Sequence, residues 1–199
     1  AQEAVDFLTS KGIDGELYRN TFEAAANKFN ATTEEEKEAA NKNIFATIYN
    51  GVISGTYTSD MAKGLLSMYG ITDTENTNFT SLIDSAAEYR NAQTEEEKSN
   101  AQNKEVINIA NMIRNGELTS EEAAGYLSLL GIDKTNENYD QIEGILNNAA
   151  AYALKVEAEG KAAADVSTYG NFLDLINKGA KWEEIKIAVE ASGLDASYV

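Results

Sequence analysis

The sequence repeats itself with a period of about 61 residues. The segment TEEEK at residues 33–37 recurs at residues 94–98, and the same spacing relates Gly70-Ile71 to Gly131-Ile132. Roughly 17 of the 39 residues in 33–71 are identical to the residue 61 positions later, where chance would give a few. Self-similarity at a fixed period is the sequence signature of a repeat architecture.

A third, more divergent copy follows the second. Gly131-Ile132-Asp133 returns as Gly193-Leu194-Asp195, and Gly12-Ile13-Asp14 marks the same position near the start. Because both ends fall inside a unit, we expect a fragment or processed piece of a longer array, with worn capping repeats as the alternative. The predicted divisions are a closing helix of a preceding partial repeat at 1–11, repeats at 12–69, 70–130 and 131–192, and the start of a further partial repeat at 193–199.

Each unit is predicted to contain three helices, as the second copy illustrates. Apolar residues recur at helical spacing over about 78–91, from about 95 to 114, and from about 119 to 130. Thr94 with Glu97, and Thr119 with Glu122, have the spacing of a capping box, in which each side chain bonds the other residue's backbone. Gly131 followed by Ile132 predicts a Schellman ending for the third helix.

The composition agrees with an all-α fold. The chain has no proline, the residue that most often breaks helices, and its 43% hydrophobic content is enough to bury cores. The junctions between units are short and contain no Gly/Ser or Pro linker. We therefore expect tandem three-helix repeats stacked into a helical array, with consecutive small bundles as the alternative.

The charge of the chain argues against several classes of partner. A formal net charge of −17 and only three arginines disfavour binding to nucleic acid, where basic residues must neutralise phosphates. The same charge disfavours an anionic membrane surface, and no stretch approaches the roughly 18 apolar residues of a membrane span. We expect no nucleic-acid partner and no membrane insertion.

Candidates for catalysis or metal binding are few. The chain contains no cysteine and no histidine, which excludes thiol nucleophiles and His-dependent triads. The acidic runs at 34–36 and 95–97 lie in first helical turns, where carboxylates cap free amides and offset the helix dipole. We predict no catalytic, cofactor-binding or metal-binding residues and no cofactor.

Aromatic residues that do not recur between copies are the best candidates for a protein interface, because interfaces are enriched in aromatic side chains. Burial in the core is the competing interpretation. The candidate interface residues are Tyr49, Tyr57, Tyr69, Tyr152 and Trp182.

These observations favour a non-enzymatic, structural helical-repeat protein, as part of a multi-subunit assembly such as a phage virion. Its expected partners are other protein subunits, including copies of itself, and the expected location is a virion or an extracellular surface. The alternative is a protein-binding repeat module of a bacterial cell-surface protein. A third hypothesis is a carboxylate-based hydrolase, which the absence of cysteine and histidine does not exclude.

Overall fold

A computed structural model describes residues 1–73, 79–180 and 182–193, without the side chains of 182–184. All regular elements within these ranges are helical, so the predicted all-α fold is confirmed. The chain divides into two compact units, residues 1–72 and 73–199, which are described separately. The predicted boundaries of the individual repeats remain a prediction.

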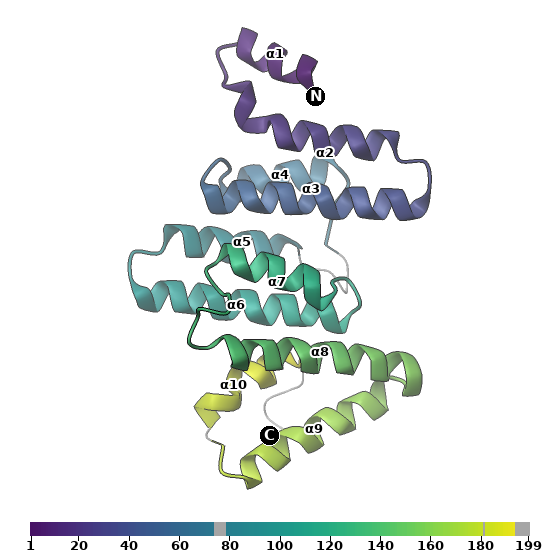
Figure 1. Ribbon diagram of the computed structural model, residues 1–199, viewed down its shortest axis with the longest axis vertical. Helices are drawn as coiled ribbons and strands as arrows, with labels where there is room; N and C mark the ends of the chain where they lie inside the picture. Colours follow the sequence, from purple (N-terminus) through teal and green to yellow (C-terminus); the bar gives the residue numbers. More distant parts are fainter. Residues whose placement is uncertain (74–78, 181, 194–199) are drawn as a thin grey trace. The chain divides into compact units, whose positions relative to one another are not determined.

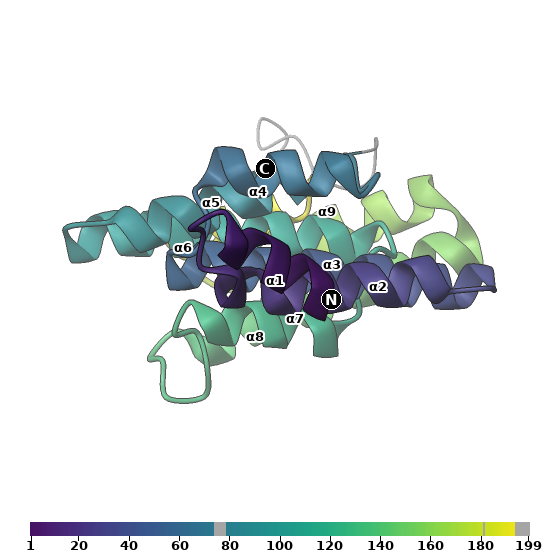
Figure 2. The ribbon, with the colours of Figure 1, turned by 90° about the horizontal axis from the view of Figure 1, so that it is seen from above.

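The first unit is built around one long helix. Its elements are α1 (Gln2–Ser10), the 3₁₀ turn η1 (Gly15–Tyr18), α2 (Arg19–Asn30), α3 (Glu34–Ser54) and α4 (Ser59–Met68). Helix α3 packs against both α2 and α4, and α1 packs against η1 and α2 (Figures 1 and 2). Ile44, Ile48 and Val52 recur along α3 at helical spacing and are buried, so this helix supplies much of the core.

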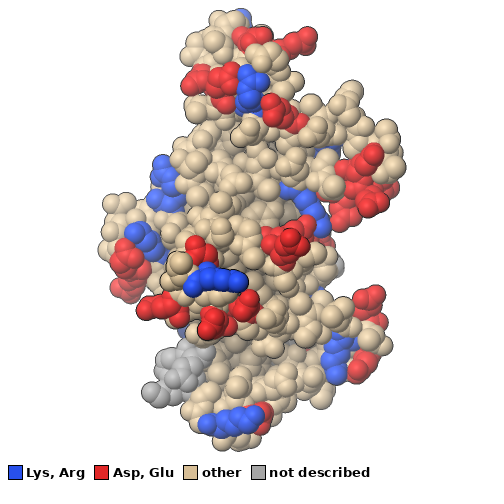
Figure 3. All heavy atoms as spheres, in the orientation of Figure 1, with Lys and Arg blue, Asp and Glu red and all other residues tan. Residues whose placement is uncertain are grey.

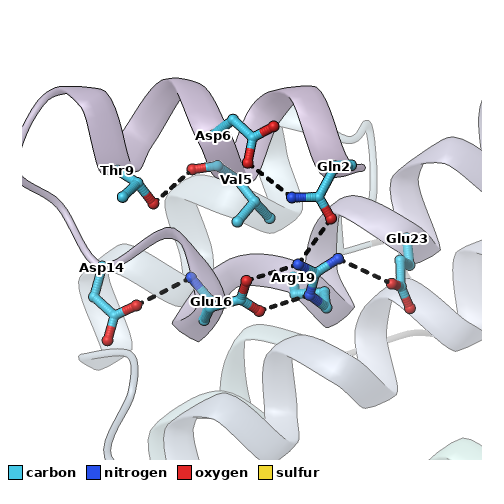
Figure 4. Close-up of polar contacts among 8 residues, drawn as sticks. All are labelled: Gln2, Val5, Asp6, Thr9, Asp14, Glu16, Arg19 and Glu23. Atoms are coloured by element: carbon cyan, nitrogen blue, oxygen red, sulfur yellow. Dashed lines mark hydrogen bonds and ion pairs between the residues drawn. The ribbon is translucent and has the colours of Figure 1, made fainter.

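Polar contacts around Arg19 join α1 to the start of α2 (Figure 4). The guanidinium donates from Nε and Nη2 to the two carboxylate oxygens of Glu16, at 2.6 and 2.7 Å, and from Nη2 to Gln2 Oε1 at 3.0 Å. Asp14 caps η1 by accepting from the Glu16 amide. A Cβ at Gly15 would collide with the backbone carbonyl of Val5, so glycine permits the close approach of η1 to α1.

In the second unit, helix α6 is the shared packing surface. The elements are α5 (Phe79–Asn91), α6 (Glu95–Arg114), α7 (Ser120–Leu129), α8 (Tyr139–Glu159), α9 (Lys161–Asn177) and α10 (Trp182–Ala191). Helix α6 packs against α5 and α7 of its own predicted repeat and against α8 and α10 of the next. Within this unit, the third predicted repeat therefore shares its core with the second.

The predicted capping boxes are confirmed in the second unit. Thr94 begins α6 and Thr119 begins α7, and each bonds reciprocally with the Glu three residues later. Thr33 makes the same box with Glu36 at the start of α3, 61 residues before Thr94. Each box satisfies amides that the first helical turn leaves without intrahelical partners.

The predicted Schellman ending of α7 is confirmed as well. Gly131 adopts a left-handed φ of 71°, and the Ile132 amide donates to the Leu127 carbonyl at 3.0 Å. Helix α4 ends in the same way at Gly70, which has a φ of 70°. Local structure at these two helix ends thus matches across the 61-residue spacing.

The third predicted repeat departs from the second at its first helix. Helix α8 has 21 residues, whereas the corresponding α5 has 13. No capping box starts α9, which begins after Gly160. None of the helices described is both long and apolar enough to cross a lipid bilayer.

Candidate functional site

Of the five candidate interface residues, three are buried and one is half-buried. Tyr49 and Tyr57 are buried in the first unit, Tyr69 is half-buried, and Tyr152 is buried in the second unit. The side chain of Trp182 lies outside the described residues. Their role in an interface remains a prediction. For Tyr57, packing against Gly51 accounts for its burial.

Tyr57 packs onto Gly51, because a Cβ at that position would collide with the tyrosine ring. The Tyr57 hydroxyl lies 2.7 Å from the Thr21 hydroxyl, and burial raises the pKa of this tyrosine. The second repeat carries Met112 and Leu118 at the corresponding positions, and both are buried. A small residue facing a large one is thus exchanged for two of intermediate size, which keeps the core filled.

Helices α8, α9 and α10 form the walls of a cavity of about 130 Å³ (Figure 1 places these helices). Its lining is mainly apolar and includes Ile145 and Ala149 of α8, Phe172 of α9 and Ala188 of α10. The exposed Asn148 also lines it, so the cavity opens towards solvent. This is the concave site whose chemistry is most distinctive among the described residues.

Arg114, the last residue of α6, brings a positive charge to this cavity. Its guanidinium lies over the ring of Tyr152, with Cζ 4.1 Å from the ring centroid. The Nε atom is buried and has no hydrogen-bond partner, while Nη1 reaches Asn111 Oδ1 only at 3.5 Å. The Tyr152 hydroxyl in turn donates a hydrogen bond to the Asp165 carboxylate at 2.6 Å. This carboxylate therefore already has a partner within the protein.

Aligned on Gly116 and Gly179, the left-handed glycines that follow α6 and α9, Tyr169 and Phe172 of α9 correspond to the buried Val106 and Ile109 of α6.

The outer face of α9 presents apolar residues to solvent. Val166, Leu173 and Ile176 recur at helical spacing and are 73%, 50% and 37% exposed. In the same alignment, Leu173 and Ile176 correspond to Ala110 and Ile113 of α6, which are buried. The neighbouring Asn111 and Arg114 of α6 lie beside Gly193, which follows α10, so this end of α6 faces the next predicted repeat.

A buried carboxylate in the second unit was missed by sequence reasoning. Glu105 of α6 is fully buried and accepts a hydrogen bond from Ser85 of α5. The first repeat has Ile44 and Ala24 at these positions, both buried. Comparing buried positions of the two copies one by one would have found this pair.

Acidic groups elsewhere serve the ends of helices. Hydrogen bonds from the backbone amides of Thr32 and Thr33 lower the pKa of Glu36, and those from Gln93 and Thr94 lower the pKa of Glu97. On the face shown in Figure 3, acidic groups are spread over the surface and basic groups lie mostly beside them. In the part of the chain that the structure describes, no three acidic residues are grouped to hold a metal ion.

Comparison of the chain with protein-family models, with curated proteins and with solved structures finds no match. Function must therefore be inferred from the two surfaces described above, the apolar outer face of α9 and the cavity with Arg114 at its wall.

Proposed function

We propose that the protein is a non-enzymatic structural component of a larger assembly, such as a phage virion, and that copies of it associate through exposed faces of their helical repeats. The observation that carries this proposal is the apolar stripe of α9, formed by Val166, Leu173 and Ile176. Such a stripe on a helix is unfavourable in water and is typical of a surface that another protein covers.

The packing inside the second unit supports a helical repeat as the occupant. Helix α6 uses one face for its own repeat and another, which includes Asn111 and Arg114, for the next. Helix α9 is the counterpart of α6, and its exposed Leu173 and Ile176 correspond to Ala110 and Ile113, which are buried in α6. A further repeat would cover them in the way that α8 and α10 cover α6.

We propose that exposed apolar residues in the first unit of a second copy supply the other side of the contact. Phe7 of α1 is 61% exposed, and Leu17 of η1 is 56% exposed. Joining the α9 stripe of one copy to this face of another is a heterologous contact, and such contacts generate rings or filaments. Because the chain carries a net charge of −17, we expect added salt to strengthen the association.

Sedimentation velocity at increasing protein concentration and salt tests the proposal. The wild type is expected to form species larger than a dimer. A variant with Leu173→Glu and Ile176→Glu and another with Phe7→Glu and Leu17→Glu are each expected to stay monomeric. A mixture of the two variants retains one intact face of each kind and should give a 1:1 dimer and nothing larger.

Phe29→Glu is the matched control, since Phe29 is 90% exposed on α2, away from both proposed faces in sequence. It should associate like the wild type. A wild type that stays monomeric up to millimolar concentration at high salt would overturn the proposal. Equal loss of association in the Phe29 variant would also overturn it, because the contact would then be nonspecific.

A further inference from the structure

We propose that the cavity between α8, α9 and α10 binds a small neutral aromatic molecule about the size of phenol. Its lining includes none of Val166, Leu173 and Ile176, so the site is independent of the proposed association through α9. The proposal rests on a comparison of corresponding helices in the second unit, where one predicted repeat has a buried tyrosine and the next has an alanine at the cavity wall.

The alanine is Ala188 of α10, and its counterpart in α7 is Tyr126. These helices are aligned on Gly131 and Gly193, which follow them with left-handed φ angles of 71° and 62°. Buried residues of α7 then correspond to buried residues of α10, namely Ala123 to Ile185, Leu127 to Val189 and Leu130 to Ser192. Tyr126 is itself buried, whereas Ala188 lines the cavity. The third predicted repeat therefore lacks a phenol ring that the second repeat has.

In the second repeat, Tyr126 lies close to the buried pair of Ser85 and Glu105. Glu105 accepts a hydrogen bond from Ser85. Burial raises the pKa of Tyr126, and the carboxylates of Glu122 and Glu105 raise it further. The ring of Tyr126 and this polar pair thus belong to one cluster formed by α5, α6 and α7.

The counterparts of this cluster line the cavity. A spacing of 63 residues relates Gly116 to Gly179, and it maps Ser85 to Asn148 and Glu105 to Thr168. The same spacing relates buried residues of α5 to buried residues of α8, namely Leu82 to Ile145, Ile83 to Leu146 and Ala86 to Ala149. Asn148, Thr168 and Ala188 all line the cavity. The cavity is therefore bounded by the positions whose counterparts surround and include the tyrosine.

The size of the cavity suits one aromatic ring. At about 130 Å³ it approaches the roughly 150 Å³ of an apolar cavity known to accept benzene. Ile145, Ala149 and Phe172 supply an apolar wall, and the exposed Asn148 marks the side that is open to solvent. A ring can therefore enter from this side and bury its faces, with a polar substituent left towards the opening.

The ligand is expected to be neutral. The Arg114 guanidinium lies over the Tyr152 ring, and Lys155 pairs with Glu159 at 3.4 Å. Both cations of the lining thus already have partners within the protein. Removing the charge of an anion from water against a mainly apolar wall is costly, which favours an uncharged ring.

Protein-detected NMR titration of the whole chain with phenol tests the site, at low salt, where the proposed association is weakest. Phenol is expected to give saturable shifts in α8, α9 and α10, with a Kd on the order of millimolar for a ligand of about seven heavy atoms. Ethanol has the hydroxyl without the ring, and benzoate has the ring with a charge. Each should bind at least about tenfold more weakly than phenol.

Ala188→Tyr restores the ring of the second repeat and should abolish the saturable shifts. Ala124→Tyr is the matched control, because Ala124 is an exposed alanine of α7 outside the lining, and it should leave the Kd unchanged. If Ala188→Tyr does not fold, Ala188→Leu supplies the test, since the first repeat has Leu65 at this position. It should weaken phenol binding at least about tenfold, because it fills part of the cavity.

Three results would overturn the proposal. The first is that phenol gives no saturable shifts in α8, α9 and α10. The second is that ethanol or benzoate binds there as tightly as phenol. The third is that a folded Ala188 variant binds phenol like the wild type.

Discussion

The Ser85 hydroxyl donates a hydrogen bond to the Glu105 carboxylate in the interior of residues 73–199, where the preceding repeat carries Ala24 and Ile44. Both polar residues are buried, with exposed fractions of 2% and 0%. Two copies of one helical unit thus fill the same core positions, one with a polar pair and the other with an apolar pair. Because removing a carboxylate from water is costly, this exchange affects stability.

Replacing the polar pair by its apolar counterpart should not destabilise the protein. Ser85→Ala alone removes a donor from a buried carboxylate and should lower the free energy of unfolding by about 1–3 kcal/mol. Glu105→Ile leaves the Ser85 hydroxyl bonded to the carbonyls of Ser81 or Leu82. The double variant should therefore equal or exceed the wild type, by up to about 4 kcal/mol.

Urea unfolding of the wild type, both single variants and the double variant gives the coupling between the two positions. A double variant less stable than Ser85→Ala alone would show that the polar pair is required for the packing of this unit. In that case the comparison with Ala24 and Ile44 would be misleading.

The capping glutamates predict how stability changes at low pH. Backbone hydrogen bonds lower the pKa of Glu36 and Glu97 from the ordinary value of 4.5, so the folded state favours the ionised forms. Their contribution is present above pH 4.5 and is lost as the pH falls through the lowered folded values. Glu97→Gln retains a side chain that can complete the box but does not titrate, so its stability should fall less steeply below pH 4.5.

Thermal unfolding between pH 3 and pH 7 measures this dependence. Glu96→Gln is the matched control, because Glu96 lies in the same helical turn outside the box. A pH profile of Glu97→Gln that is as steep as that of the Glu96 variant would contradict the assignment.

Two glycines of the first unit should respond to alanine with opposite signs. Gly70 ends α4 with a φ of 70°, and no atom lies close enough to meet an added Cβ. Gly70→Ala should therefore cost about 1–2 kcal/mol from the backbone alone. Gly64 is inside α4 with equally open surroundings, so Gly64→Ala should stabilise by about 0.5–1 kcal/mol. Denaturant unfolding of both variants checks the signs, and destabilisation by both would contradict this reading of the helix end.

The sequence predicted helices and their ends well because those signals are local. The predicted helices near 95–114 and 119–130 are α6 and α7, and Thr94, Thr119 and Gly131 act at their ends as expected. Each of these roles depends on side chains and amides within one helical turn. For α5, the first position of the expected range, residue 78, lies outside the described residues.

The sequence did not predict the cavity or the buried carboxylate, because both depend on contacts between distant helices. Glu105 looks like any helical glutamate until α5 brings Ser85 against it. Arg114 gains its setting only when α8 places Tyr152 beneath its guanidinium. Tyr57 was a candidate for an interface because it does not recur, yet it is buried against Gly51. A break in the repeat can reflect either repacking of the core or function, and sequence alone does not separate them.

Hydrogen exchange of the whole chain, compared with Ile145→Ala, tests most directly whether successive repeats share a core through α6. Ile145 is a buried residue of α8 that lines the same cavity as Arg114, and its truncation should cost about 2–5 kcal/mol. If α6 is shared, amides of α5, α6 and α7 should lose protection together with those of α8–α10. Faster exchange confined to α8–α10, with α6 protected as in the wild type, would contradict the account.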